Sequence, residues 1–141
     1  MVRRATAADE EVVYQLVCVL EGEELPRQHF GEIYTSQQKD SRYIPLVWEN
    51  GSGVLGFINL RLEGQLHHGG LVAEIVELVV DPAYRGQGVG KALVEEGEKF
   101  ARKQGCVLLE VASARSREDA HRFYQREGFS STHLKLTKNW I

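Results

Sequence analysis

Apolar residues recur at helical spacing in the first part of the chain. They follow Thr6-Ala7-Ala8-Asp9, a capping box at which we expect a helix to begin, and they are Val12, Val13, Leu16, Val17 and Leu20. Gly22 is expected to end this helix. The spacing of Phe30, Ile33 and Tyr34 predicts a second helix, with Pro26 near its start.

Shorter apolar runs predict strands. We expect a first strand at Val2–Ala5, another at Ile44–Trp48 with Pro45 at an edge or strand start, and a hairpin at Asn50-Gly51 that leads into Val54–Leu60. After a break between Gly64 and Gly70, a long strand runs to Asp81.

The second half continues with a glycine loop and an amphipathic helix, and then with a strand at Gly105–Val111. Ser116-Arg117-Glu118-Asp119 reads as a capping box for a helix that ends at Gly128, and the alternation from Phe129 to Trp140 predicts closing strands. Together these elements predict one α/β domain of the α+β type over residues 1–141, with a mixed, mostly antiparallel sheet and helices on both faces.

Composition is that of a soluble globular protein, with 43% hydrophobic and 26% charged residues. The net charge of −3 gives no general electrostatic reason to bind nucleic acid or an anionic membrane. No apolar stretch approaches the roughly 20 residues of a membrane helix, so we expect a cytoplasmic protein. Cys18 and Cys106 lie in apolar segments without metal-ligand spacing, which predicts reduced core cysteines and no metal site.

The glycine loop Arg85-Gly86-Gln87-Gly88-Val89-Gly90 lies between a strand and a helix. Glycines let the backbone approach a ligand closely, and the free N–H groups of a helix's first turn attract anions, so this context favours a phosphate cradle over a simple tight turn. A Walker loop is excluded because Arg85 stands where it needs glycine and Ala92 where it needs Ser or Thr. A dinucleotide fingerprint fails because Lys91 replaces the third glycine.

The remaining signature, R-x-x-G-x-G after a strand ending in Asp-Pro, resembles the acetyl-CoA loop of the GNAT family of N-acetyltransferases. About thirty residues later, Ala120 to Phe129 resembles that family's A-x-x-x-Y-x-x-x-G-F segment. Within the family, three segments look most like the aminoalkylphosphonate N-acetyltransferases, namely Leu66–His68, Glu74–Val80 and Asp119–Tyr124. The chain departs from the family pattern at Arg117, where the family usually has Asn.

The resemblance implies direct transfer of an acetyl group from acetyl-CoA, the co-substrate, to a small primary amine. It implies that the coenzyme is bound by backbone and side-chain groups of Leu78, Val79, Val80, Arg85, Gly86, Gln87, Gly88, Val89, Gly90, Lys91, Arg117, Ala120 and Phe123. Tyr124 matches the family tyrosine that can protonate the departing thiolate; the alternative is a core tyrosine with a hydrogen-bonded hydroxyl.

A base has to remove a proton from the acceptor, because a primary amine is mostly protonated at pH 7. Glu74 and Glu77 interrupt the long apolar strand beside the glycine loop and are the candidates, although both could be surface carboxylates. Being three residues apart, they are expected on opposite faces of a regular strand, unless a bulge breaks the parity.

Acceptor-binding candidates are His67 and His68, in the break before the long strand, together with Glu74 and Arg61. The sequence leaves open a non-catalytic acyl-CoA-binding or regulatory module and an enzyme that acetylates protein amines. Exposed sheet edges favour a homodimer.

Overall fold

A five-stranded mixed sheet organises the chain, whose computed structural model describes residues 1–141. The strands lie in the order β1-β2-β3-β4-β5, and only the β4–β5 pair is parallel. Their bounds are β1 Val2–Arg4, β2 Tyr43–Asn50, β3 Gly53–Gln65, β4 Gly70–Val80 and β5 Leu108–Val111. The helices are α1 Glu10–Glu21, α2 Arg27–Gln38, α3 Val89–Lys103 and α4 Glu118–Arg126, with short 3₁₀ turns at Ala7–Asp9, Leu66–His68 and Pro82–Tyr84. The predicted fold class is confirmed.

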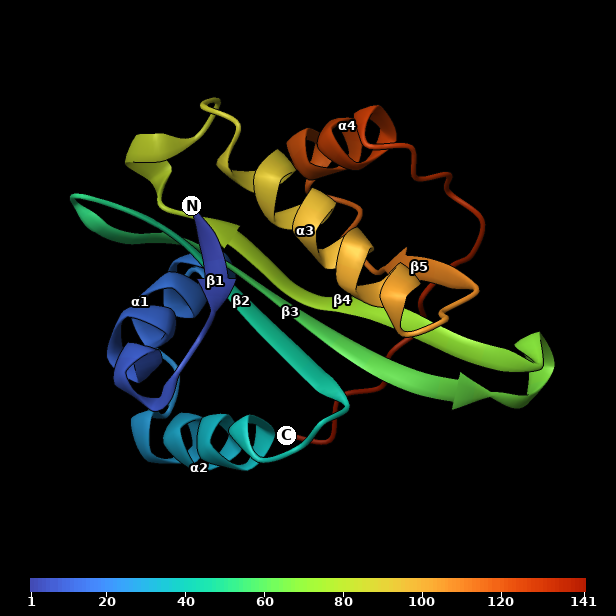
Figure 1. The fold of residues 1–141 in the computed structure, drawn as a ribbon, viewed down its shortest axis with the longest axis horizontal. Helices are drawn as coiled ribbons and strands as arrows, with labels where there is room; N and C mark the ends of the chain where they lie inside the picture. Colours follow the sequence, from blue (N-terminus) through green and yellow to red (C-terminus); the bar gives the residue numbers. More distant parts are fainter.

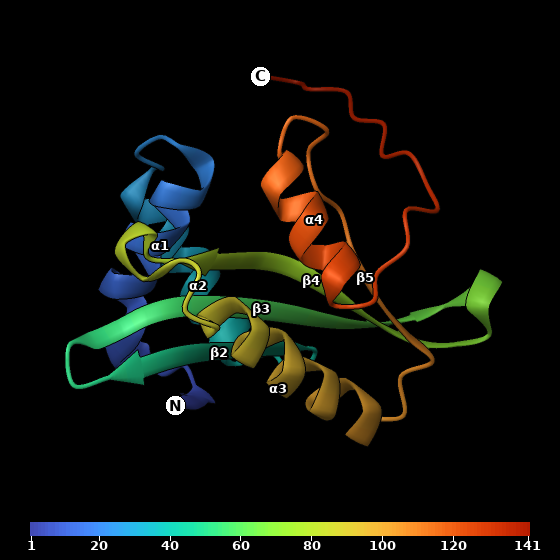
Figure 2. The same ribbon diagram turned by 90° about the horizontal axis from the view of Figure 1, so that it is seen from above.

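The helices cover both faces of the sheet (Figures 1 and 2). On one face α1 and α2 pack on an apolar cluster that includes Val13, Val17 and Phe57. On the other face α3 contributes Leu93 and Val94 to a larger cluster. No helix of the structure is both long enough and apolar enough to cross a membrane.

The capping box at Thr6 is present, and it fixes the N-terminal end of the first helical segment. Asp9 accepts hydrogen bonds from the Thr6 N–H at 2.8 Å and from both Arg3 Nη atoms, at 2.8 and 3.0 Å. Arg3 also contacts Glu49 of β2, so this ion cluster fastens β1 and the start of α1 to the sheet. Gly22 ends α1 in the left-handed conformation, as expected, with φ of 73°.

β4 contains a bulge that changes which face its carboxylates occupy. Asn59 of β3 pairs with Glu77 while the next residue, Leu60, pairs with Ile75, which leaves Val76 as an extra residue without a partner. Asn59 and Arg61 share one face of β3, and they contact Glu77 and Glu74 respectively. Glu74 and Glu77 therefore lie on the same face, the one covered by α2, and the expectation of opposite faces is wrong because the strand is not regular.

The C-terminal part differs most from the predicted elements. Residues 129–141 form no strand, and Leu134 and Leu136 are 70% and 89% exposed. Figure 2 shows this segment running away from α4 along the outside of the molecule. Alternating apolar residues require a neighbouring strand and a surface to bury them, and β5 pairs only with β4.

Three smaller expectations are also wrong. The predicted capping box requires Ser116 as the N-cap of α4, but the helix begins one residue later and its N-cap is Arg117. No side chain caps this helix. Cys18 and Cys106 are free thiols, but they are half-buried and not core residues. The strand predicted over Gly105–Val111 is shortened to β5, whose pairing with β4 begins only at Leu108.

Candidate active site

The second half of β4 has an open edge in the middle of the molecule. Pairing between β4 and β5 ends at Ile75 and Val111, immediately before the bulge residue Val76. The Asp81 N–H donates to the Leu55 carbonyl of β3, so the backbone groups of Val80 and, by alternation, of Leu78 point away from β3. β5 does not extend to them, and this edge is free to bind an extended ligand.

The side chains along this edge are divided between the two apolar clusters. Leu78 and Val80 are half-buried against the α3 cluster, whereas Val79 is only 4% exposed and packs on the α1 and α2 side. All three residues were predicted to contact the coenzyme. Their side chains serve the core, so only their backbone groups remain for a ligand.

The glycine loop places a set of free N–H groups beside this edge. None of the backbone N–H groups from Arg85 to Lys91 donates a hydrogen bond within the protein; the first helical donor is Ala92, which bonds the Gly88 carbonyl at 3.0 Å. The positive end of the α3 dipole lies at the same place. This arrangement is suited to bind the oxygen atoms of a phosphate group.

The backbone conformation requires glycine at two positions of the loop, and a third glycine lies against α4. Gly86 and Gly88 have φ values of 77° and 85°, which other residues rarely adopt. Gly90 has an ordinary φ, and a Cβ there would be in van der Waals contact with two ring atoms of Phe123, at 3.4 Å. The α4 helix therefore packs closely on the first turn of α3, and this contact positions the following residue, Tyr124.

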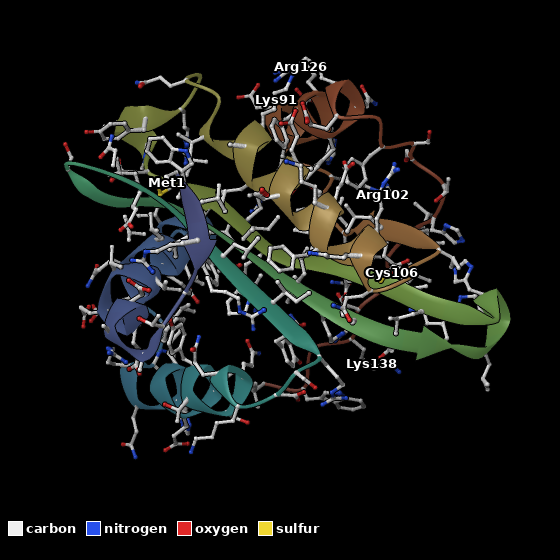
Figure 3. The ribbon with its side chains drawn as sticks, viewed as in Figure 1. Met1, Lys91, Arg102, Cys106, Arg126 and Lys138 are labelled. Atoms are coloured by element: carbon white, nitrogen blue, oxygen red, sulfur yellow. The ribbon has the colours of Figure 1, made fainter.

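Of the other loop residues, one is buried in the core and two are exposed to solvent. Val89 is 2% exposed and anchors the start of α3 in the core. Gln87 and Arg85 are exposed, and the Arg85 guanidinium has no acidic partner in the protein. Lys91 lies at the loop end of α3, whereas Arg102 lies toward its other end (Figure 3). Arg85 is thus the cation best placed to meet an anion at the loop.

Glu77 is a half-buried carboxylate on the α1 and α2 side of the open edge. Its Oε1 accepts a hydrogen bond from Asn59 Nδ2 at 2.9 Å, and its Oε2 has no protein partner. Burial raises the pKa of Glu77, the nearby carboxylates of Glu21 and Glu74 act in the same direction, and the Asn59 hydrogen bond opposes them. A carboxylate with a raised pKa and a free oxygen is suited to accept a proton.

Glu74 has a different environment from Glu77. Its Oε1 accepts a hydrogen bond from Arg61 Nη2 at 2.6 Å, and the pair is partly exposed. Glu74 Oε1 is thus already bonded to a cation, whereas Glu77 has no cationic partner. The Nη1 atom of Arg61 has no protein partner and keeps its N–H groups free, because Arg61 bonds Glu74 through Nη2; its Nε is buried without an acceptor.

Tyr124 lies on the other side of the open edge, in α4. Its ring packs edge-on against Phe123 and Phe129, with centroid distances of 5.3 and 5.5 Å. Burial raises the pKa of Tyr124 to about 12, which Arg117 partly opposes. Its hydroxyl makes no hydrogen bond in the protein, unlike the hydroxyls of Tyr14 and Tyr34, which donate to backbone carbonyls at 2.6 Å. The alternative of a core tyrosine with a satisfied hydroxyl is therefore wrong for Tyr124.

The start of α4 reaches the end of α1 across the open edge. Arg117 Nη2 donates to the Leu20 carbonyl at 3.1 Å, over a sequence separation of 97 residues. Ala120 is half-buried one turn further along α4, before Phe123. Glu77 and Tyr124 share no hydrogen bond; β4 carries Glu77 on the α1 and α2 side of the open edge, and α4 carries Tyr124 on the other side.

His67 and His68 do not join this group. They form the exposed turn at the tip of the β3–β4 hairpin, with ring centroids 4.3 Å apart. Glu74 follows His68 by six positions, roughly 20 Å at the usual rise of a strand. No three His, Cys, Asp or Glu side chains lie together in an arrangement that could hold a metal ion.

Sequence reasoning missed Asn59, which is 3% exposed and touches Glu77. A signal was available, because Asn59 is a polar residue inside the apolar run Val54–Leu60. A buried amide in such a run requires hydrogen-bond partners.

The chain belongs to the acetyltransferase (GNAT) family, whose model matches residues 10–129, and it is an N-acetyltransferase. It is 40% identical over 137 residues to the aminoalkylphosphonate N-acetyltransferase of Salmonella typhimurium, with 96% of this chain and 88% of that protein covered. It is also 37% identical over 77 residues to a glucosamine 6-phosphate N-acetyltransferase of Trypanosoma brucei brucei, covering 54% of this chain and 50% of that protein. Among solved structures, a transcriptional regulator from Bacillus halodurans C-125 superimposes with a TM-score of 0.91 at 26% identity, over 99% of both chains.

Proposed function

We propose that this enzyme transfers the acetyl group of acetyl-CoA directly to the primary amine of a small aminoalkylphosphonate. The observation that carries the coenzyme part is the row of free N–H groups from Arg85 to Lys91, next to the open edge at Leu78 and Val80. The loop suits the pyrophosphate, with Arg85 adding charge, and the β4 edge suits the pantetheine arm.

The acceptor part rests on the relatives and on Arg61. Two of the relatives act, by their names, on molecules that carry both an amine and a phosphorus oxyanion. Arg61 lies on the same face as Glu77 and keeps N–H donors free beyond its contact with Glu74. A guanidinium with free donors is suited to bind a phosphonate.

The reaction needs one base and one donor, and the site offers a residue for each. Glu77 Oε2 takes a proton from the bound ammonium group, and the freed nitrogen lone pair attacks the thioester carbonyl carbon. The N–H of Val80 donates to the carbonyl oxygen, which becomes negative as the new C–N bond forms. The oxyanion then re-forms the carbonyl as the C–S bond breaks, and the Tyr124 hydroxyl hydrogen-bonds to the leaving thiolate. The second proton of the attacking nitrogen passes through this hydroxyl to the thiolate, which gives the amide and the free thiol of coenzyme A. No covalent acyl-enzyme step is required.

Thiol release from acetyl-CoA with a panel of amines tests this function. Aminomethylphosphonate and 2-aminoethylphosphonate are expected to give a higher kcat/KM than propylamine, glucosamine 6-phosphate, amino acids or a lysine peptide. A preference for the lysine peptide would overturn the small-molecule assignment, and a preference for glucosamine 6-phosphate would overturn the phosphonate. Adding Mg²⁺ or Mn²⁺ in parallel shows whether a divalent ion assists.

Replacement of Arg61 tests the phosphonate contact. The double variant Arg61→Met, Glu74→Gln avoids leaving an unpaired Glu74, and Glu74→Gln alone is its matched control. The double variant should raise KM for 2-aminoethylphosphonate about tenfold or more, which is the usual loss of affinity when one charge-assisted hydrogen bond is removed. It should leave KM for propylamine unchanged. An equal change for both amines would remove Arg61 from the acceptor site.

A further inference from the structure

A chain of polar side chains connects α2 to Glu77 through the buried Asn59. Asn59 Nδ2 donates to Gln37 Oε1 of α2 and to Glu77 Oε1, both at 2.9 Å. Asn59 is 3% exposed, at the centre of β3. An amide in such a position costs stability unless it is bonded, so its contacts specify how α2 and the sheet fit together.

The geometry determines what Glu77 can do. An amide nitrogen has two hydrogens, and Asn59 directs one to Gln37 and one to Glu77. Glu77 Oε1 is thereby occupied as an acceptor, and Oε2 is the oxygen left for a proton. Asn59 Oδ1 is buried without a partner, which shows that the amide is oriented for its donors and not for its acceptor.

No other side chain offers Glu77 a hydrogen bond. α1 contributes Glu21 and β4 contributes Glu74, both acidic, and α2 contributes the uncharged Gln37, which bonds to Asn59. The nearest cation on β3, Arg61, is engaged with Glu74. Arg117 and Tyr124 of α4 lie across the open edge. Without Asn59, a carboxylate at this site would face burial and two like charges alone.

We propose that Asn59, held by Gln37, is a positioning residue that keeps Glu77 ionised and directs its Oε2 toward the acceptor amine. The inference rests on the proposed role of Glu77 as the base. The proton moves from the substrate ammonium to Oε2, and Asn59 stays bonded to Oε1 throughout. Asn59 itself does not touch the reacting atoms.

The pH dependence of kcat/KM for 2-aminoethylphosphonate tests this role. Asn59→Leu preserves side-chain volume and removes the hydrogen bond that stabilises the ionised Glu77. The acidic limb of the profile, where kcat/KM falls as the base is protonated, should therefore move upward by about one to two pH units, the equivalent of one hydrogen bond to a carboxylate. Asn59→Asp puts a second carboxylate beside Glu77 and should move the limb upward as well. Gln37→Leu should shift it less in the same direction, and Gln38→Leu, on the next α2 residue, should not shift it.

Glu77→Gln, measured alongside, separates the hypothesis that Glu77 is the base from the hypothesis that Asn59 positions it. Loss of the acidic limb in Glu77→Gln, together with an unshifted limb in Asn59→Leu and Gln37→Leu, would overturn the positioning role and leave the base role intact. A wild-type rate and limb in Glu77→Gln would overturn the base role and this inference with it. Thermal unfolding of each variant checks the fold, and Gln37→Leu carries the test if Asn59→Leu does not fold.

Discussion

Tyr124→Phe should separate catalysis from stability, because the Tyr124 hydroxyl has no partner in the folded protein. Removing an unbonded hydroxyl takes away no internal hydrogen bond, so the melting temperature should stay within about 1 °C of the wild type. If the hydroxyl bonds to the leaving thiolate, kcat should fall about 100-fold, or about 2.7 kcal/mol in the activation barrier.

Tyr34→Phe is the matched control for this prediction. Tyr34 is 7% exposed, and its hydroxyl donates to the Thr6 carbonyl at 2.6 Å. Losing that bond should cost about 1 kcal/mol, which for a chain of 141 residues lowers the melting temperature by about 3 °C. Its kcat should be unchanged, because the contact lies in the packing of α2 against the N-terminal segment.

The assay combines thermal unfolding with thiol release at saturating acetyl-CoA and amine. The pKa of about 12 keeps Tyr124 protonated throughout the accessible range, so the wild-type kcat should show no alkaline decline from this group below about pH 10. A Tyr124→Phe enzyme with wild-type kcat would refute the donor role. A drop in melting temperature as large as that of Tyr34→Phe would refute the claim that its hydroxyl is unbonded.

Three other predictions follow from the loop, the base and the N-terminal ion cluster. Arg85→Ala should raise KM for acetyl-CoA about tenfold with kcat unchanged, since it removes one charge-assisted phosphate contact, whereas Arg102→Ala at the far end of α3 should change neither value in steady-state kinetics. Glu77→Gln should raise the melting temperature at pH 8 but not at pH 4. Burial raises the pKa of Glu77 in the folded protein, so the stability that its protonated form contributes is present below the ordinary pKa of 4.5. That stability is lost as the pH rises through the folded-state pKa, and the uncharged Gln does not lose it. Asp9→Asn should lower the free energy of unfolding by about 1–2 kcal/mol at pH 7, because the Arg3 contact lowers the pKa of Asp9 below its ordinary value of 3.8. The difference in stability between wild type and variant should close as the pH falls through that lowered pKa. Urea unfolding at several pH values measures this difference.

The glycine loop was predictable from the sequence because its properties are local. The strand before it, the left-handed positions at Gly86 and Gly88 and the helix after it depend on residues a few positions apart. The same holds for the capping box at Thr6 and the end of α1 at Gly22.

The placement of the carboxylates was not predictable in this way. Whether Glu74 and Glu77 share a face depends on the register between β3 and β4, and Val76 is apolar like its neighbours, so nothing in the strand marks it as the extra residue. The C-terminal alternation misled for the same reason, since a strand depends on a neighbour that the pattern does not contain. Asn59 could have been noticed as a polar residue in an apolar run, but its contact with Glu77 depends on the same register.

The bulge at Val76 is an insertion whose effects on side chains and on backbone can be separated by deleting a single residue. Without Val76 the strand is regular, the two glutamates stand two positions apart, and they still share the face that α2 covers. What the deletion removes is the added twist that coincides with the point where β4 leaves β5. A chain lacking Val76 should therefore keep its base, its Asn59 contact and its core, and lose the gap at Leu78 and Val80. That result would assign the opening of the sheet to one residue of extra length and not to side-chain chemistry.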